Sequence, residues 1–127
     1  MKRELPTKFK PFEKALKDNP LIACIEPYEE YLSIQLSTPL GDGDDAILLY
    51  LIDEGDGEFS LSDSAWIYTL LPYENPSLTE KVILIEAERK GFSANGMTLY
   101  AIVNPDTLAS KISDFDELVR VLQGFDA

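Results

Sequence analysis

Ala-Ile-Leu-Leu-Tyr-Leu-Ile (46–52), Asp-Glu-Gly-Asp-Gly (53–57) and Glu-Phe-Ser-Leu-Ser-Asp (58–63) follow one another without a break. The first segment is an apolar run without alternation, which is typical of a strand covered on both faces. The second contains two glycines, which allow the positive φ angles of a tight turn. The third places Phe59 and Leu61 on the inner side of a strand, with the serine between them outward. The stretch therefore predicts a β-hairpin at the centre of the fold.

Three further segments have the character of strands. Leu32, Ile34 and Leu36 alternate with polar residues, which is the period of a half-buried strand. Strands are also predicted over Leu21–Glu26 and over Met97–Val103, the latter buried. The dipeptide Asn95-Gly96 before the last of these is a hairpin-turn signal.

Helices are predicted from capping residues. Pro11 suits the first position of a helix over Lys10–Lys17, and the carboxylate of Asp63 is expected to cap a helix over Ala65–Leu71. The spacing from Ser77 to Glu80 is that of a capping box and predicts a helix over 78–90 that Gly91 ends.

Two points about the helices stay open. Val82–Ile85 by itself also fits a strand. The last helical region runs from Asn104 to Gly124, and Ser113-Asp114 would divide it in two if these residues hydrogen-bonded to nearby backbone groups. The whole pattern predicts one acidic α+β domain over residues 1–127. We expect an antiparallel sheet of about five or six strands, with three to four helices on one face or at its ends.

The charge of the chain is uneven. The net charge is −12, yet residues 1–17 contain six Lys or Arg residues and only two Glu residues. The span Asp18–Glu80 contains fourteen acidic residues and no Lys or Arg. Such a field repels nucleic acids and membrane headgroups and attracts basic proteins or cations. The alternative reading is that the acids only keep the protein soluble.

Residue types exclude several classes of site. The chain has no histidine and a single cysteine, Cys24, which excludes zinc sites and Ser-His or Cys-His nucleophiles. Cys24 lies in an apolar strand context, which predicts a buried thiol. Because the charged N-terminus lacks the features of a signal peptide and no long apolar run occurs, we expect a cytoplasmic protein.

The acidic loops at 42–45 and 53–58 have a second interpretation, since hard cations bind several carboxylate oxygens. Asp and Gly are also the default residues of turns, which explains both loops without a cation. Glu88-Arg89-Lys90 has the Glu-x-Lys spacing of a metal-dependent nuclease, with Asp44 or Asp63 as the upstream acid. The dipole at the end of a helix explains the two bases equally well.

Trp66, Tyr68 and Tyr73 are close in sequence to the acidic loops. They fit a partly buried core. They also fit a protein interface, where exposed aromatic side chains rimmed by acids supply much of the affinity.

The central stretch resembles a family of small domains of unknown function found in bacteria and their prophages. The resemblance rests on Thr38-Pro39-Leu40, Gly43-Asp44, the strand 47–50 and Leu61-Ser62-Asp63, and it covers about a quarter of the chain. The family pattern continues with an acid and a glycine where this chain has Ser64-Ala65. The resemblance implies a bacterial or phage setting and no particular activity.

These observations favour a non-catalytic acidic binding protein with no cofactor or metal. The concrete hypothesis is a phage or mobile-element inhibitor that covers the nucleic-acid-binding surface of a host nuclease or CRISPR effector. Its partner would be a basic protein surface, with no direct contact to nucleic acid or membrane. The alternatives are an antitoxin or immunity partner of a basic toxin, and a metal-dependent enzyme. The predicted partner-binding residues are Asp42, Asp44, Asp45, Asp53, Glu54, Asp56, Glu58, Trp66 and Tyr73.

Overall fold

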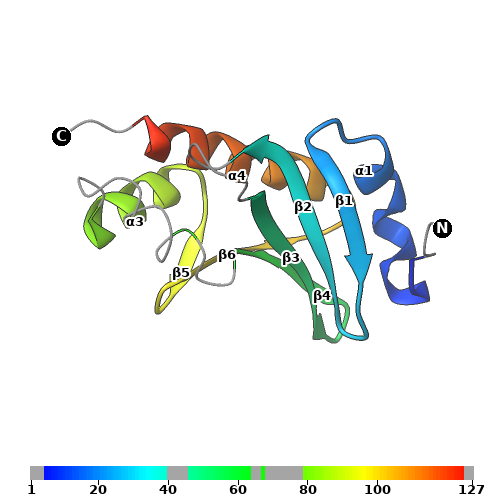
Figure 1. The fold of residues 1–127 in the computed structure, drawn as a ribbon. Coiled ribbons are helices and arrows are strands. Elements are labelled where there is room, and N and C mark those ends of the chain that lie inside the picture. Colours follow the sequence, from blue (N-terminus) through cyan, green and yellow to red (C-terminus); the bar gives the residue numbers. More distant parts are fainter. Residues whose placement is uncertain (1–4, 40–45, 64–66, 68–78, 125–127) are drawn as a thin grey trace.

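A computed structural model describes residues 5–39, 46–63, 67 and 79–124. Its centre is one antiparallel sheet with the strand order β1-β2-β3-β4-β6-β5 (Figure 1). The strands are β1 (Ile22–Pro27), β2 (Tyr31–Pro39), β3 (Ala46–Gly55), β4 (Glu58–Ser62), β5 (Ser93–Asn95) and β6 (Thr98–Val103). The helices are the 3₁₀ helix η1 (Thr7–Phe12) and the α-helices α1 (Glu13–Lys17), α3 (Glu80–Arg89) and α4 (Leu108–Gln123). The predicted α+β class is confirmed.

One face of the sheet forms the hydrophobic core. α4 and the η1–α1 segment pack against it, and Phe12 meets Phe59 of β4 with the ring centroids 4.9 Å apart. The core residues of β2 and β3 are at most 1% exposed: Leu32, Ile34 and Leu36 of β2, and Ile47, Leu49 and Leu51 of β3. The alternation predicted for β2 is therefore confirmed, and Phe59 and Leu61 face the core as expected.

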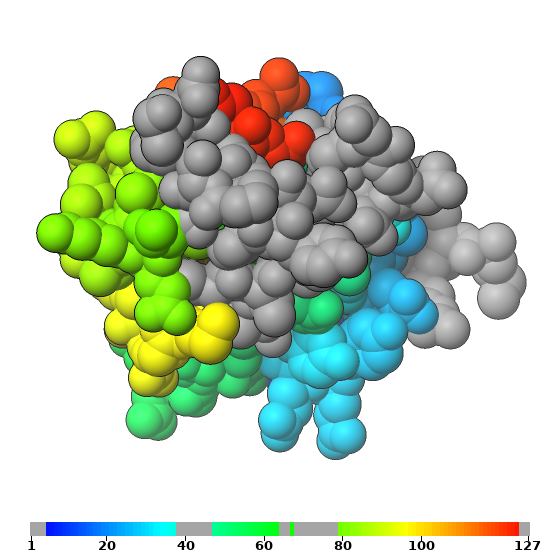
Figure 2. All heavy atoms as spheres, turned by 60° about the vertical axis from the view of Figure 1, so that its left-hand side comes forward, coloured from blue at the N-terminus to red at the C-terminus, as the bar shows by residue number. Residues whose placement is uncertain are grey.

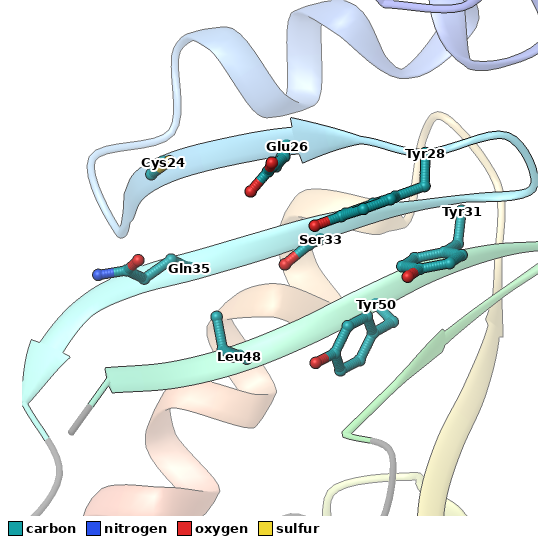
Figure 3. Close-up of a pocket in the computed structure, with 8 residues that line it drawn as sticks. All are labelled: Cys24, Glu26, Tyr28, Tyr31, Ser33, Gln35, Leu48 and Tyr50. Carbon is teal, nitrogen blue, oxygen red and sulfur yellow. The ribbon is translucent and has the colours of Figure 1, made fainter.

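The opposite face of the sheet is not covered in the same way, and here two predictions were wrong. β3 is not buried on both faces, because Leu48, Tyr50 and Ile52 are partly exposed. β6 is likewise buried on one face only, and Ile102 is 53% exposed. α4 runs behind the sheet, so it shields only the core face (Figure 3). Ser60 of β4 lies on this opposite face, yet it is buried. It pairs with Ile52 of β3 on one side and with Ile102 of β6 on the other.

Both predicted hairpin turns are confirmed. Asp56 and Gly57 lie between the paired residues Gly55 and Glu58 and have φ angles of 54° and 79°, the two positive φ angles that a type I′ turn requires. Asn95 is the last residue of β5 and pairs with Thr98, so Gly96, with a φ of 63°, and Met97 form the turn, one residue later than the Asn95-Gly96 signal.

The helices differ from the prediction at their starts. Helical structure begins at Thr7, so Pro11 lies inside the segment and not at its first position. The buried side chain of Phe9 explains the earlier start, since it packs against Phe59 from the 3₁₀ turn.

α3 is a helix, so the strand alternative for Val82–Ile85 was wrong.

The cap of α3 is Thr79, whose hydroxyl accepts the backbone N–H of Val82 at 3.3 Å. Ser77, the predicted cap, lies outside the described residues. α3 ends as expected, because Gly91 has a φ of 86° and Phe92 donates its backbone N–H to the carbonyl of Ala87.

α4 is one continuous helix, and Ser113-Asp114 do not divide it. Ile112 and Phe115 are both fully buried, so the apolar stripe of the helix continues through this point. Asp114 pairs instead with Lys111, three residues earlier.

Asp63 is the buried residue that closes β4. Its carboxylate accepts the backbone N–H of Ile67, which is helical, and the backbone N–H of Leu99 in β6, both at 2.9 Å. The prediction that Asp63 caps a helix is confirmed for one N–H group, that of Ile67. The rest of the predicted helix over Ala65–Leu71 lies outside the described residues.

The prediction of a buried thiol at Cys24 was wrong, because this side chain is exposed. A β-bulge shifts the pairing between Ile22 and Cys24, so that Cys24 pairs with Gln35 while Ile25 pairs with Ile34 of the core. The bulge places Cys24 on the open face of an edge strand.

Candidate functional site

Two acidic turns lie side by side at one end of the sheet. The backbone N–H of Asp53 in β3 donates to the carbonyl oxygen of Glu30 in the β1–β2 turn at 3.1 Å. Figure 1 shows the β1–β2 and β3–β4 turns next to each other at the lower end of the sheet. In Figure 2, residues of the β1–β2 hairpin, in light blue, stand out from the lower surface. The exposed acids of these turns are Glu29, Glu30, Glu54, Asp56 and Glu58, and we call them the acidic hairpin end.

Asp53 has a different role from these five exposed acids. Its carboxylate accepts the backbone N–H of Gly55 at 3.0 Å and forms an ion pair of 3.4 Å with Lys8 of η1. It is partly buried. Asp53 therefore shapes the β3–β4 turn and joins it to the N-terminal segment.

The structure brings together only part of the predicted partner-binding set. Glu54, Asp56 and Glu58 meet at the acidic hairpin end, with Asp53 beside them. The other predicted residues lie outside the described part of the chain: Asp42, Asp44, Asp45, Trp66 and Tyr73. The same holds for Tyr68.

Glu29 and Glu30 belong to the same surface and were not predicted as site residues. A sequence signal for them exists. In an antiparallel sheet whose strands pair in chain order, every second turn lies at the same end. The β1–β2 and β3–β4 turns therefore had to be neighbours once the four strands were assigned.

A hollow of about 340 Å³ opens on the exposed face of the sheet, directly beside the acidic hairpin end (Figure 3). We call it the tyrosine hollow. Figure 3 shows three tyrosine rings gathered at one end of it, with Cys24 and Gln35 at the other. The residues that line it come from β1, β2, β3 and the turn after β1: Cys24, Glu26, Tyr28, Tyr31, Ser33, Gln35, Leu48 and Tyr50.

The three rings are in contact. Tyr28 stacks on Tyr31 with the ring centroids 4.7 Å apart and an angle of 14° between the planes. Tyr31 meets Tyr50 edge to face, with the centroids 5.7 Å apart. Tyr28 is 42% exposed, whereas Tyr31 is partly buried.

Strand register places the acid and the rings together. Glu26 pairs with Ser33, and Ser33 pairs with Tyr50, so their side chains form one row across β1, β2 and β3. The tyrosine hollow therefore combines aromatic faces, a carboxylate and neutral polar groups. None of the described residues that line it is basic.

Two of the residues considered for a nuclease site, Asp63 and Lys90, have partners within the fold. Both carboxylate oxygens of Asp63 accept backbone N–H groups inside the fold. Lys90, at the end of α3, pairs with Glu117 of α4. Asp44 lies outside the described residues. Among the residues that the structure describes, no group of three or more Asp, Glu or Cys side chains is arranged to hold a metal ion.

Comparisons with protein-family models, curated proteins and solved structures find no match. The resemblance to the bacterial and prophage family stays a prediction. Within the described chain, no helix has the length and apolar character needed to cross a membrane.

Proposed function

We propose that the chain is a non-catalytic binding protein that docks its acidic hairpin end on the basic, nucleic-acid-binding surface of another protein. In its concrete form it is a phage or mobile-element inhibitor that acts in the bacterial cytoplasm on a host nuclease or CRISPR effector. The observation that carries the proposal is the Asp53–Glu30 hydrogen bond, which groups the acids of two turns on one surface.

Charge pairing inside the protein leaves this surface acidic. Lys8 pairs with Asp53, the partly buried acid, whereas Lys10 of η1 and Lys17 of α1 both pair with Glu13 of α1. Grouped carboxylates steer a basic partner in solution and occupy positions that phosphates would otherwise take. The interaction should therefore weaken as salt is added.

The experiment compares two variants with the same change in net charge. The hairpin-end variant carries Glu29→Gln, Glu30→Gln, Glu54→Gln and Asp56→Asn. The control carries Asp18→Asn, Glu80→Gln, Glu88→Gln and Glu117→Gln, which change exposed acids of the helices and their ends. Asn tolerates the positive φ at position 56, so the turn should be kept. Each protein is immobilised and exposed to bacterial lysate at low and moderate salt.

We expect the wild type and the control variant to retain a nucleic-acid-binding protein that the hairpin-end variant loses. Added DNA or RNA should displace this protein. Equal retention by the two variants would contradict the proposal. A retained basic protein that nucleic acid does not displace would instead favour the immunity-partner alternative.

A further inference from the structure

We propose that the tyrosine hollow is a binding site for an arginine side chain of the basic partner. This inference rests on the proposed function, because it names the contact that would anchor such a partner. Three observations support it: the stacked rings, the carboxylate beside them, and the place of the hollow next to the acidic hairpin end.

The rings fit a planar cation. A cation within about 6 Å of a ring centroid is attracted by the negative face of the ring. The Tyr28 ring is nearly parallel to that of Tyr31, and Tyr28 is 42% exposed, so a guanidinium group can reach the stacked pair. Arginine stacks on aromatic rings in this way, whereas the ammonium group of lysine is compact and strongly hydrated.

The other lining groups fit the same ligand. Glu26 lies in the row of Ser33 and Tyr50, so a carboxylate lies close to the rings and adds negative charge beside them. Ser33 and Gln35 add neutral acceptors. The volume of about 340 Å³ is at the lower end of the range for small-ligand sites, which suits one long side chain better than a large cofactor.

The test uses nona-arginine and nona-lysine peptides, which carry the same number of charges. Attraction by the acidic hairpin end is then similar for both, and stacking distinguishes them. A cation–π contact at an exposed site predicts about two- to five-fold tighter binding of nona-arginine, measured by titration calorimetry.

Matched variants test whether the preference for nona-arginine over nona-lysine comes from the tyrosine hollow. Tyr28→Leu and Tyr31→Leu together should bring the ratio of the two affinities close to one. Tyr100→Leu is the control, because Tyr100 lies on the same face, paired with Ser62, and is not part of the hollow. It should keep the wild-type ratio. If the double variant has a lower Tm, Tyr28→Leu alone serves, because this side chain is the more exposed of the two.

Cys24 gives a second readout, since it is the only cysteine of the chain and lines the hollow. Nona-arginine should slow its alkylation by neutral iodoacetamide more than nona-lysine does, and the double variant should lose this difference. Equal binding and equal protection by both peptides would overturn the arginine site alone. If neither peptide bound, the proposed function would be overturned as well.

Discussion

The two faces of the sheet are built from the same strands, yet they have different environments. On the core face, Leu49 and Leu51 of β3 are fully buried beneath the helices. On the open face, Leu48 and Tyr50 of the same strand are partly exposed and line the tyrosine hollow. The comparison shows that an apolar strand does not imply burial on both sides. On the open face of the sheet, Leu48 and Tyr50 instead contribute to the exposed surface that contains the tyrosine hollow.

The largest effect should come from Leu49→Ala on the core face. It leaves a cavity in a closely packed interior and should lower the free energy of unfolding by about 2–5 kcal/mol. Leu48→Ala, one residue earlier on the open face, should lower it by about 1 kcal/mol or less. Urea unfolding of both variants measures the difference. Equal losses would show that the two faces are packed alike.

Asp63→Ala tests the buried carboxylate at the end of β4. The substitution removes the acceptor of two backbone N–H groups, those of Ile67 and Leu99, and should lower the free energy of unfolding by about 2–4 kcal/mol. Asp63→Asn keeps one acceptor oxygen and should lose less. Asp106→Ala, at an exposed position, is the control and should stay within about 0.5 kcal/mol of the wild type. An equally small loss for Asp63→Ala in chemical denaturation would refute the structural role of this carboxylate.

The smallest effect should come from Ile102→Thr on the open face of β6. Ile102 is 53% exposed, and threonine keeps the β-branched shape that suits a strand. The free energy of unfolding should change by no more than about 0.5 kcal/mol. A loss above about 1 kcal/mol would mean that this part of the open face contributes to the core.

Much of the fold was predictable, because local rules decided it. The turn residues at 55–57 and 95–96 specified both hairpins, and the alternation in β2 specified its buried face. The exposed Cys24 was not predictable, because a bulge changes which face a side chain occupies and leaves no sequence signal at this position.

The candidate site was predicted in part. The acids at 54–58 were identified from their density, whereas Glu29 and Glu30 become neighbours of that turn only through strand pairing. The tyrosine hollow depends on register in the same way. Tyr28 and Tyr31 are far from Tyr50 in sequence, and the pairing of Ser33 with Tyr50 brings the rings together.

The bulge in β1 also alters the edge of the sheet. An unbroken edge strand offers a row of backbone donors and acceptors to which a strand of another molecule can add. The bulge after Ile22 interrupts this row, and Pro27 removes one more donor. At the other edge, β5 has only three residues. Neither edge of the described sheet is a good template for strand addition, so copies of this protein should resist joining into longer sheets or fibrils even when it is abundant.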